Sequence, residues 1–475
     1  MRCLLVMPAW NPRDVFAKEF VDSQLTLWHP TGLMYVASSL QKAGHEVRLV
    51  DGAFYRREEI GRMVREFAPR FLGLYSSIPL WPKTKDIIED IKGIDPSIVT
   101  AVGGPTAIGL RERLYEKSDA VDLIFTAEAE YAAPKAIARL ESGQDLSDVE
   151  SLIYRKNGKV VINPAGEPIQ DLDLLPYPAR DLLGDLKKYV PAPSTYKRLP
   201  IATVISSRGC TNRCIYCFHI YPERKIRFRS AKNIVDEIQY CIGQYGVKEI
   251  RFFDDNFCGD YDRVMEFCDL MDERKIRIAW YCNSRVDFVD RKLMQRMRKA
   301  GCWCILFGVE SGVQKNLNML RKNITVDQIK RSIREAKEVG LEVYTPFIFG
   351  IPGETYEEAL RSIELAIELD AHYVNFHTLA PFPGSELYDH VEKYGTLTGK
   401  ESDYNFERAG FVPFTLTREQ IFELRQKAFR KFYMRPSYIL KRLLHARSRE
   451  DFRTLFAGAK SLFYLATKRD AFRFE

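Results

Sequence analysis

The sequence contains no apolar run long enough to cross a bilayer, which takes roughly 18 residues or more. No glycine-rich G-x-G-x-x-G follows the first apolar segment, Arg2 to Met7, so a dinucleotide site is not expected there. Ten cysteines are present but only three are closely spaced, and nothing after Met1 reads as a signal peptide. We therefore expect a reducing, cytoplasmic setting and no disulfide framework.

Charge is unevenly distributed along the chain. The net charge is +7, yet residues 425–475 alone hold 14 Lys and Arg against 4 Asp and Glu, a balance of +10. The remainder therefore carries 57 basic against 60 acidic residues, or −3. With 475 residues, 46% hydrophobic and 28% charged, the chain has the composition of a globular protein of two or three domains.

Three cysteines, Cys210, Cys214 and Cys217, are spaced C-x3-C-x2-C directly after the apolar run 201–205. That run predicts a strand, so the cysteines lie on the loop that leaves its carboxyl end, where α/β sheets bind ligands. Electron-transfer clusters are normally held by four cysteines. Three thiolates at this spacing would leave one iron of a four-iron cube without a protein ligand, free for a substrate or cofactor.

Two alternatives remain for these cysteines. A zinc site would need a fourth ligand, which His219 or Cys241 could supply, and three structural cysteines would need none. The stretch 206–219, with the aromatic residue Tyr216 before the third cysteine, resembles the signature of the radical S-adenosylmethionine superfamily. This resemblance implies that S-adenosylmethionine chelates the open iron and that an external reductant, such as flavodoxin or ferredoxin, feeds the cluster.

The first third of the chain alternates short apolar runs with helical patterns. Such alternation predicts an α/β fold, a doubly wound, Rossmann-like parallel sheet with ligand loops at the strand ends. The predicted strands are 2–7, 46–50, 71–75, 98–102 and 121–125. A hairpin with an Asn-Gly turn is predicted at 152–162, at the start of a linker rich in turn residues.

Three short motifs of this region, 30–33, 44–47 and 102–105, resemble in their order the cobalamin-binding domain of many radical S-adenosylmethionine enzymes. The alternative is a cofactor-free domain of the same fold. The motif D-x-H-x-x-G is absent, because Asp51 is followed by Gly-Ala-Phe, so no histidine of that motif can bind cobalt from below. The resemblance implies a cobalamin site formed by Ser76, Ser77, Leu80, Trp81, Gly103, Gly104 and Glu128, although Trp81 could equally be plain core.

The middle of the chain continues with strand and helix units from Ile201 to Leu379. Six predicted strands fit a partial (β/α)6 TIM-like barrel that is open along one side. The superfamily resemblance implies that Glu310 and Ser284 contact the ribose of S-adenosylmethionine, and that Arg285 or Arg321 pairs with its carboxylate. It also implies that Gly350, Ile351 and Pro352 meet the adenine, and that Asp254 and Asp255 lie near the amino group.

The predicted boundaries are 1–145 for the cobalamin-binding domain, 146–195 for the hairpin and linker, 196–400 for the barrel and 401–475 for a basic helical region. That last region is interpreted foremost as a cap on the barrel. The alternative is a surface for anionic lipid, placing the protein at the inner face of the membrane, while nucleic-acid binding is not expected.

The implied reaction is radical methylation of an unactivated carbon in a small molecule or lipid, with a 4Fe-4S cluster, S-adenosylmethionine and cobalamin as cofactors. Non-methylating radical chemistry, namely cyclisation, rearrangement or carbon–carbon coupling, is the alternative within the same architecture. A non-catalytic metal-binding protein is the alternative from another class.

Overall fold

The computed structural model of the protein describes residues 1–9, 27–221, 223–445, 452, 455–456 and 458–460. Its first domain is built on one twisted sheet of strand order β2-β1-β3-β4-β5-β6-β7. The five strands β1 to β5 are parallel, and β6 and β7 form an antiparallel hairpin at the edge. The bounds are β1 Arg2–Met7, β2 Glu46–Asp51, β3 Phe71–Tyr75, β4 Val99–Gly103, β5 Leu123–Phe125, β6 Leu152–Lys156 and β7 Lys159–Ile162.

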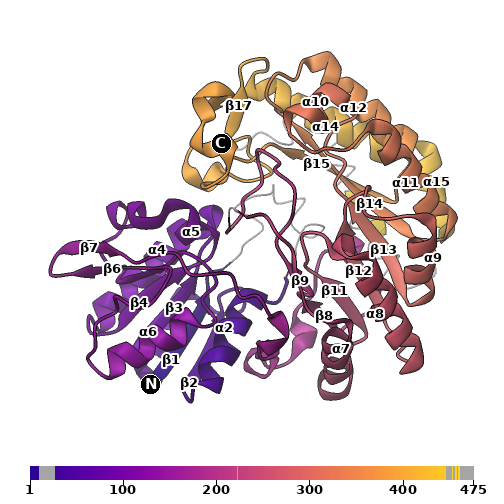
Figure 1. Ribbon diagram of the computed structural model, residues 1–475. Helices are drawn as coiled ribbons and strands as arrows, with labels where there is room; N and C mark the ends of the chain where they lie inside the picture. Colours follow the sequence, from indigo (N-terminus) through magenta and orange to yellow (C-terminus); the bar gives the residue numbers. More distant parts are fainter. Residues whose placement is uncertain (10–26, 222, 446–451, 453–454, 457, 461–475) are drawn as a thin grey trace.

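Helices cover both faces of this sheet (Figure 1). Alternate residues of β1 explain the two layers, because Cys3 and Leu5 pack with α2 while Leu4 and Val6 pack with α3 and α4. The doubly wound prediction is therefore confirmed. The helices are α2 Thr31–Lys42, α3 Arg57–Phe67, α4 Trp81–Ile94, α5 Pro105–Leu110 and α6 Ala132–Glu141. In such sheets ligands bind at the carboxyl ends of the strands, where the order reverses.

The Asn-Gly hairpin is present, with positive φ at Asn157 and Gly158 as a tight two-residue turn requires. The hairpin was expected at the start of the linker. In the structure Phe125 of β5 pairs with Leu152 of β6, so the hairpin also extends the first sheet. The unpaired edge of the short strand β5 is covered in this way.

The second domain holds six parallel strands in the order β15-β14-β13-β12-β11-β8. They form an arc with helices on its outer side (Figure 1), and this confirms the predicted open barrel. The strands are β8 Ile201–Val204, β11 Glu249–Phe252, β12 Ala279–Ser284, β13 Cys302–Phe307, β14 Glu342–Phe349 and β15 Tyr373–Thr378. The outer helices are α7 Ala231–Tyr245, α8 Tyr261–Glu273, α9 Arg291–Lys299, α10 Gln314–Met319, α11 Val326–Glu338 and α12 Tyr356–Leu369.

After β15 come α13 Glu386–Asp389, an antiparallel pair formed by β16 Gly395–Leu397 and β17 Phe411–Pro413, α14 Arg418–Tyr433 and α15 Pro436–His445. Helix α14 packs on α12 and on β15 and buries Leu424, Arg425 and Phe432. This helix behaves as the predicted cap. Beyond α15, the aromatic residues Phe452 and Phe456 are exposed, and Phe463 and Tyr464 lie outside the described residues. In the part of the chain that the structure describes, no helix is both long and apolar enough to span a bilayer.

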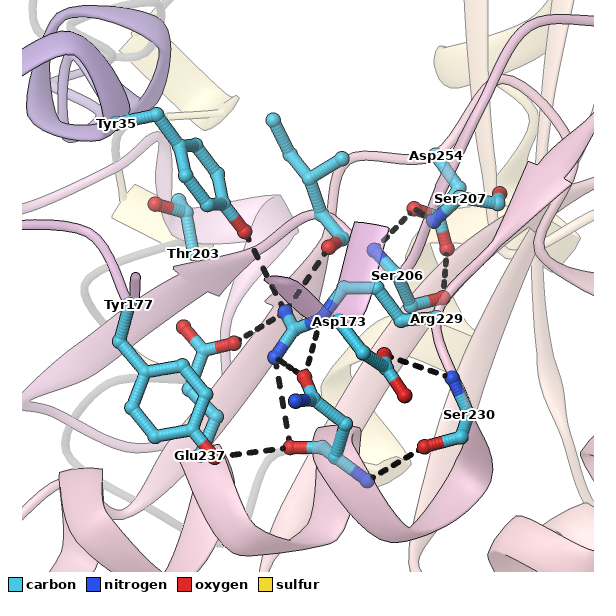
Figure 2. Close-up of polar contacts among 12 residues, drawn as sticks. Tyr35, Asp173, Tyr177, Thr203, Ser206, Ser207, Arg229, Ser230, Glu237 and Asp254 are labelled. Carbon is cyan, nitrogen blue, oxygen red and sulfur yellow. Dashed lines mark hydrogen bonds and ion pairs between the residues drawn. The ribbon is translucent and has the colours of Figure 1, made fainter. Parts of the chain in front are cut away.

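A buried polar network joins the two domains (Figure 2). The Glu237 carboxylate, on α7, accepts hydrogen bonds from Arg180 of the linker at 2.6 Å and from Arg229. Arg229 also reaches the hydroxyl of Tyr35, on α2 of the first domain, at 3.4 Å. Both Arg180 and Glu237 are fully buried, so their charges are compensated only by each other and by these neighbours.

Candidate functional site

The three predicted cluster cysteines lie on a loop whose two ends pair with each other. Strand β9, Ser207–Arg208, runs antiparallel to β10, Arg227–Phe228, and the intervening loop crosses the concave side of the barrel (Figure 1). We call β9 and β10 the neck of the cluster loop. Gly209 follows at φ +95°, and a Cβ there would lie 2.3 Å from the carbonyl oxygen of Lys225. Only glycine fits this position.

The start of the loop is held by Asp254, which follows β11. Its carboxylate accepts the backbone N–H of Ser206 at 2.6 Å and that of Ser207 at 2.8 Å, together with the Ser206 hydroxyl. Burial raises the pKa of Asp254, and these hydrogen bonds oppose the rise. Asp254 therefore serves to anchor the loop, while the neighbouring Asp255 is accessible to solvent.

Within the loop, Cys214 is buried, Cys210 is half-buried and Cys217 is accessible to solvent. Burial, the Cys214 thiol and the Asp255 carboxylate raise the pKa of Cys217 to about 12. The backbone N–H of Cys217 donates to the carbonyl of Cys214 at 3.1 Å, so the chain forms a tight turn between these two cysteines.

Across the described residues, no three His, Cys, Asp or Glu side chains converge on a single-ion site. The zinc alternative therefore lacks a ligand set there, and Cys241 is buried on α7 beside Arg180. A four-iron cube carries its irons at separate corners, so its thiolates need not converge on one point. Three thiols on one loop fit such a cube.

Glu310 and Lys322 form a buried ion pair next to the loop. Lys322 Nζ lies 2.8 Å from Glu310 Oε1, and both side chains are less than one-tenth exposed. Glu310 has φ +66° and is tied to β14 by two backbone hydrogen bonds, with Pro346 and Ile348. Gly308 makes room for the pair, because a Cβ there would lie 2.7 Å from each charged atom.

The ion pair also faces the cluster loop. Burial, followed by the charges of Glu310 and of Cys214, raises the pKa of Tyr216. Tyr216 packs on an apolar cluster that includes Ile215 and Ile351, so the structure brings together three of the predicted residues, Tyr216, Glu310 and Ile351. Lys322 was not predicted from the sequence, because it lies after the short helix α10 and outside any recognisable motif.

The two candidate arginines differ in position. Arg285 is buried, holds Asp287 with two hydrogen bonds of 2.9 Å and donates to the carbonyl of Lys322 at 2.9 Å. Arg321 is half exposed and binds Glu386 in a fork at 2.5 and 2.8 Å. The structure therefore places the Arg285 guanidinium, and not that of Arg321, beside the Glu310–Lys322 pair.

Ser284, at the end of β12, donates to Asn256 Oδ1 at 3.3 Å. The same oxygen accepts the backbone N–H of Arg285, while the buried Asn256 Nδ2 has no partner within the described chain. A buried donor without a partner is costly unless a ligand satisfies it. Asn256 is a second residue that the sequence did not single out, although it belongs to the Asp-Asp-Asn run after β11.

The predicted adenine loop is built around Glu354. Its Oε2 accepts the backbone N–H groups of Gly350 at 2.9 Å and Ile351 at 3.3 Å, and Gly350 has φ +86°. Burial raises the pKa of Glu354 to about 8 against these hydrogen bonds. Ile351 and Pro352 are both buried.

The predicted cobalamin residues lie at the carboxyl ends of β3 and β4. Ser76 is buried, donates its N–H to Gly103 at 2.9 Å and accepts the N–H of Thr106 at 3.1 Å. Gly104 has φ +91°, and a Cβ there would lie 2.8 Å from Ser76 O, whereas a Cβ on Gly103 would meet open space. Ser77 is half-buried beside them. We refer to these glycine and serine residues, which lie at the strand ends where such sheets bind ligands, as the cradle.

The remaining three cobalamin candidates lie elsewhere. Leu80 and Trp81 are both buried. Trp81, the first residue of α4, belongs to the core cluster that includes residues of α3, in agreement with the alternative that it is plain core. Glu128 follows β5 and is ion-paired with Arg208 and Arg227 of the neck, so its carboxylate faces the other domain.

Comparison with known proteins places both domains. The Radical SAM superfamily model matches residues 204–366, and the B12 binding domain model matches residues 20–137. The barrel is therefore a radical SAM domain, and the domain before it is a B12 binding domain. This radical SAM protein carries a cobalamin-binding domain before its barrel and is an enzyme that uses a 4Fe-4S cluster, S-adenosylmethionine and cobalamin.

Among its relatives, the uncharacterized methyltransferase PH0819 of Pyrococcus horikoshii is 29% identical over 93% of this chain and 94% of that protein. The anaerobic magnesium-protoporphyrin IX monomethyl ester cyclase of Rubrivivax gelatinosus is 27% identical over 87% of this chain and 75% of its own length. Cytidylyl-2-hydroxyethylphosphonate methyltransferase of Streptomyces wedmorensis is 26% identical over 86% of both chains.

Two solved structures share the whole architecture. The cobalamin-dependent S-adenosylmethionine radical enzyme OxsB, with aqua-cobalamin and S-adenosylmethionine bound, superimposes with a TM-score of 0.73 at 17% identity, covering 98% of this chain and 71% of OxsB. The radical S-adenosylmethionine methyltransferase TsrM of Kitasatospora setae gives a TM-score of 0.68 at 18% identity, covering 96% of this chain and 95% of TsrM. These similarities show a common fold.

Proposed function

We propose that this radical SAM enzyme transfers a methyl group to an unactivated carbon of a small-molecule or lipid substrate. One structural observation supports a reaction that uses both cofactors together. The loop after β5, at the ligand edge of the cobalamin domain, contacts the neck of the cluster loop through Glu128. This contact supports a proposal in which the two cofactor sites lie on adjoining faces of the domains. The methyltransferase relatives support methyl transfer as the outcome.

When bound, the cluster would supply the electron for reductive cleavage of S-adenosylmethionine, and cobalamin would supply the methyl group. In our proposal Cys210, Cys214 and Cys217 hold the cluster. Glu310 accepts hydrogen bonds from the ribose hydroxyls. Lys322, next to Cys214 and Glu310, and Arg285 attract the methionine carboxylate by charge.

Further residues complete the proposed S-adenosylmethionine site. The free Nδ2 of Asn256 and the Ser284 hydroxyl donate hydrogen bonds, and Ile351 and Pro352 exclude water from the adenine. For the cobalamin we propose the cradle formed by Ser76, Ser77, Gly103 and Gly104. An external reductant such as flavodoxin or ferredoxin delivers the electrons.

A second candidate is radical ring closure, because the magnesium-protoporphyrin cyclase relative aligns with most of this chain. Product analysis separates the two reactions. Methyl transfer consumes two molecules of S-adenosylmethionine, one giving 5′-deoxyadenosine and one giving S-adenosylhomocysteine when the methyl group is replaced. Ring closure by hydrogen abstraction gives 5′-deoxyadenosine without S-adenosylhomocysteine.

The test uses anaerobically reconstituted full-length enzyme with reductant and extracts from cells that lack it. We expect equal amounts of the two nucleoside products and an extract component that gains one CH2. A Cys214→Ala variant serves as the control and should form neither product. Release of 5′-deoxyadenosine with no S-adenosylhomocysteine and no methylated component would contradict methyl transfer.

We also propose that helix α15 rests on an anionic membrane surface. Its apolar side chains point outward, since Ile439, Leu440, Leu443 and Leu444 are 41% to 70% exposed. Its other face is held against the barrel, where Tyr438 donates to His372 O at 2.9 Å and Arg442 to Tyr373 Oη at 3.2 Å. The surplus of +10 charges in residues 425–475 suits a negatively charged lipid surface.

Flotation with vesicles of phosphatidylglycerol and phosphatidylcholine tests this contact. We expect association that weakens with salt and that falls when Leu440 and Leu444 are both replaced by serine. Leu174→Ser is the matched control, because Leu174 is an equally exposed leucine in the linker, at 62%. Flotation that is unchanged by the helix α15 variant would contradict the proposal.

A further inference from the structure

The Glu128 carboxylate of the cobalamin domain binds both strands of the neck of the cluster loop. Glu128 Oε1 accepts Arg208 Nη1 at 2.9 Å and Arg227 Nη2 at 2.8 Å, and Oε2 accepts Arg227 Nη1 at 2.8 Å. Arg208 and Arg227 face each other in the two-residue ladder of β9 and β10. One carboxylate therefore bridges both strands of the neck from the opposite domain.

Neighbouring groups fix this carboxylate in place. Glu128 Oε2 also accepts the backbone N–H of Ile169 at 3.0 Å and the hydroxyl of Tyr221, from the cluster loop itself, at 3.2 Å. Glu130 supports Arg208 from the side, with 2.6 Å between Oε1 and Nη2. The Arg208 guanidinium also lies over the Tyr35 ring at 5.1 Å.

The bridge lies out of solvent. The Glu128 side chain is 5% exposed and Arg227 is 10% exposed. Burial opposes ionisation of Glu128, yet Arg227 and Arg208 hold its pKa at about 2. Ion pairs that are shielded from water are stronger and more directional than surface pairs, and breaking one leaves an uncompensated buried charge.

The cluster loop is held at its neck, by Asp254 of the barrel and by Glu128 of the other domain, and again at its tip. Near its tip, the Ile215 N–H donates to Leu320 O at 3.2 Å, and the Leu387 N–H donates to Ile215 O at 2.9 Å, so Cys214 and Cys217 are positioned by the barrel. Cys210 lies only two residues from Arg208, at the neck. The neck, and not the tip, sets the position of Cys210 relative to the other two cysteines.

We propose that Glu128 is a positioning residue for the iron–sulfur cluster, acting from the cobalamin domain through Arg208 and Arg227 on Cys210. The site in which the cluster is assembled is thereby completed by the neighbouring domain. This role differs from cobalamin contact, which the resemblance implied for Glu128. It rests on the cluster itself and does not depend on methyl transfer to any substrate.

The test compares full-length Glu128→Gln, Arg227→Gln and Glu150→Gln enzymes after anaerobic reconstitution with iron, sulfide and hydroxocobalamin. Glu150 is the matched control, because it is exposed and lies in the same small hollow as Glu128. Three readouts are taken: iron bound per chain after desalting, the electron paramagnetic resonance spectrum of the reduced cluster with and without S-adenosylmethionine, and cobalamin retained after gel filtration.

For Glu128→Gln we expect retained cobalamin, loss of iron and a changed cluster spectrum. Release of 5′-deoxyadenosine should be at least about tenfold slower, as a displaced reacting centre predicts. Arg227→Gln should show the same pattern. If Glu128→Gln does not fold, Arg227→Gln alone tests whether the bridge positions the cluster. Glu150→Gln should match the unmodified enzyme.

Two results would overturn the proposal. Either Glu128→Gln and Arg227→Gln keep the iron content and spectrum of Glu150→Gln, or Glu128→Gln loses cobalamin while its cluster stays unchanged. The second result would instead support a contact between Glu128 and cobalamin. None of the three readouts requires a methyl acceptor, so a failure of the proposed methyl transfer would not affect this test.

Discussion

At the scale of single residues, the buried Lys322 beside Glu310 allows a direct test of the proposed S-adenosylmethionine site. Lys322→Gln removes the positive charge that we assign to the methionine carboxylate, and a charge-assisted hydrogen bond contributes about 1.5 to 3 kcal/mol. We expect the concentration of S-adenosylmethionine that gives half-maximal 5′-deoxyadenosine release to rise at least about tenfold.

Lys315→Gln provides the control for that measurement. Lys315 lies on the neighbouring helix α10, is 58% exposed and pairs with Glu358. The same half-maximal concentration for both variants would contradict the assignment. Thermal unfolding of each variant separates a lost contact from a lost fold.

A second residue-scale prediction concerns pH. The pKa of Glu354 rises from 4.5 to about 8 because the side chain is buried. The folded protein then binds a proton that the unfolded chain releases above pH 4.5, so this group stabilises the fold most at low pH. The contribution is lost as pH rises toward 8, with a slope of at most about 1.4 kcal/mol per unit.

Glu354→Gln should therefore flatten the dependence of the free energy of unfolding on pH between 5 and 8, as measured by urea unfolding. The exposed Glu357→Gln, on the next turn of the chain, should leave it unchanged. Parallel pH profiles for the native and Glu354→Gln proteins would contradict a protonated carboxyl.

The sequence predicts single residues well where a motif fixes them. Tyr216, Glu310 and Ile351 meet in the structure as the resemblance implied. Lys322 and Asn256 could not be predicted, because their roles arise from strand ends that meet only after folding. For Glu128, spacing alone could not reveal that two arginines about 80 and 100 residues later would bind it.

At the scale of elements, helix α7 carries the most consequential contact. Its Glu237 compensates two buried arginines, and removing one partner of a buried ion pair costs about 3 to 5 kcal/mol. We expect Glu237→Gln to lower the free energy of unfolding by that amount in guanidinium titrations. Asp236→Asn, on the exposed side of the same helix, should cost less than about 1 kcal/mol.

Strands were the elements that the sequence predicted best, because each buried apolar run ends at a polar or glycine residue. The pairing partner of the hairpin was less predictable. The alternation of apolar and polar residues and the Asn-Gly turn predict the hairpin itself. The edge of β5 with which it pairs exists only once the sheet has formed, so the sequence pattern does not predict it.

At the scale of the whole molecule, one apolar core runs through both domains. Leu5 and Met34 of the first domain and Ala202 and Ile234 of the second belong to the same buried cluster. Because neither domain can expose this shared surface without cost, we expect a single heat-absorption peak in scanning calorimetry. Two resolved peaks would show that the domains melt independently.

The arc of six strands has a consequence for what the enzyme accommodates. A closed ring of eight strands leaves an interior just wide enough for its own side chains. Here β8 and β15 lie at the two ends of the sheet and do not pair with each other, so the concave side is not sealed by backbone. The width of the space on this side is therefore set by the loops that border the arc, the cluster loop among them.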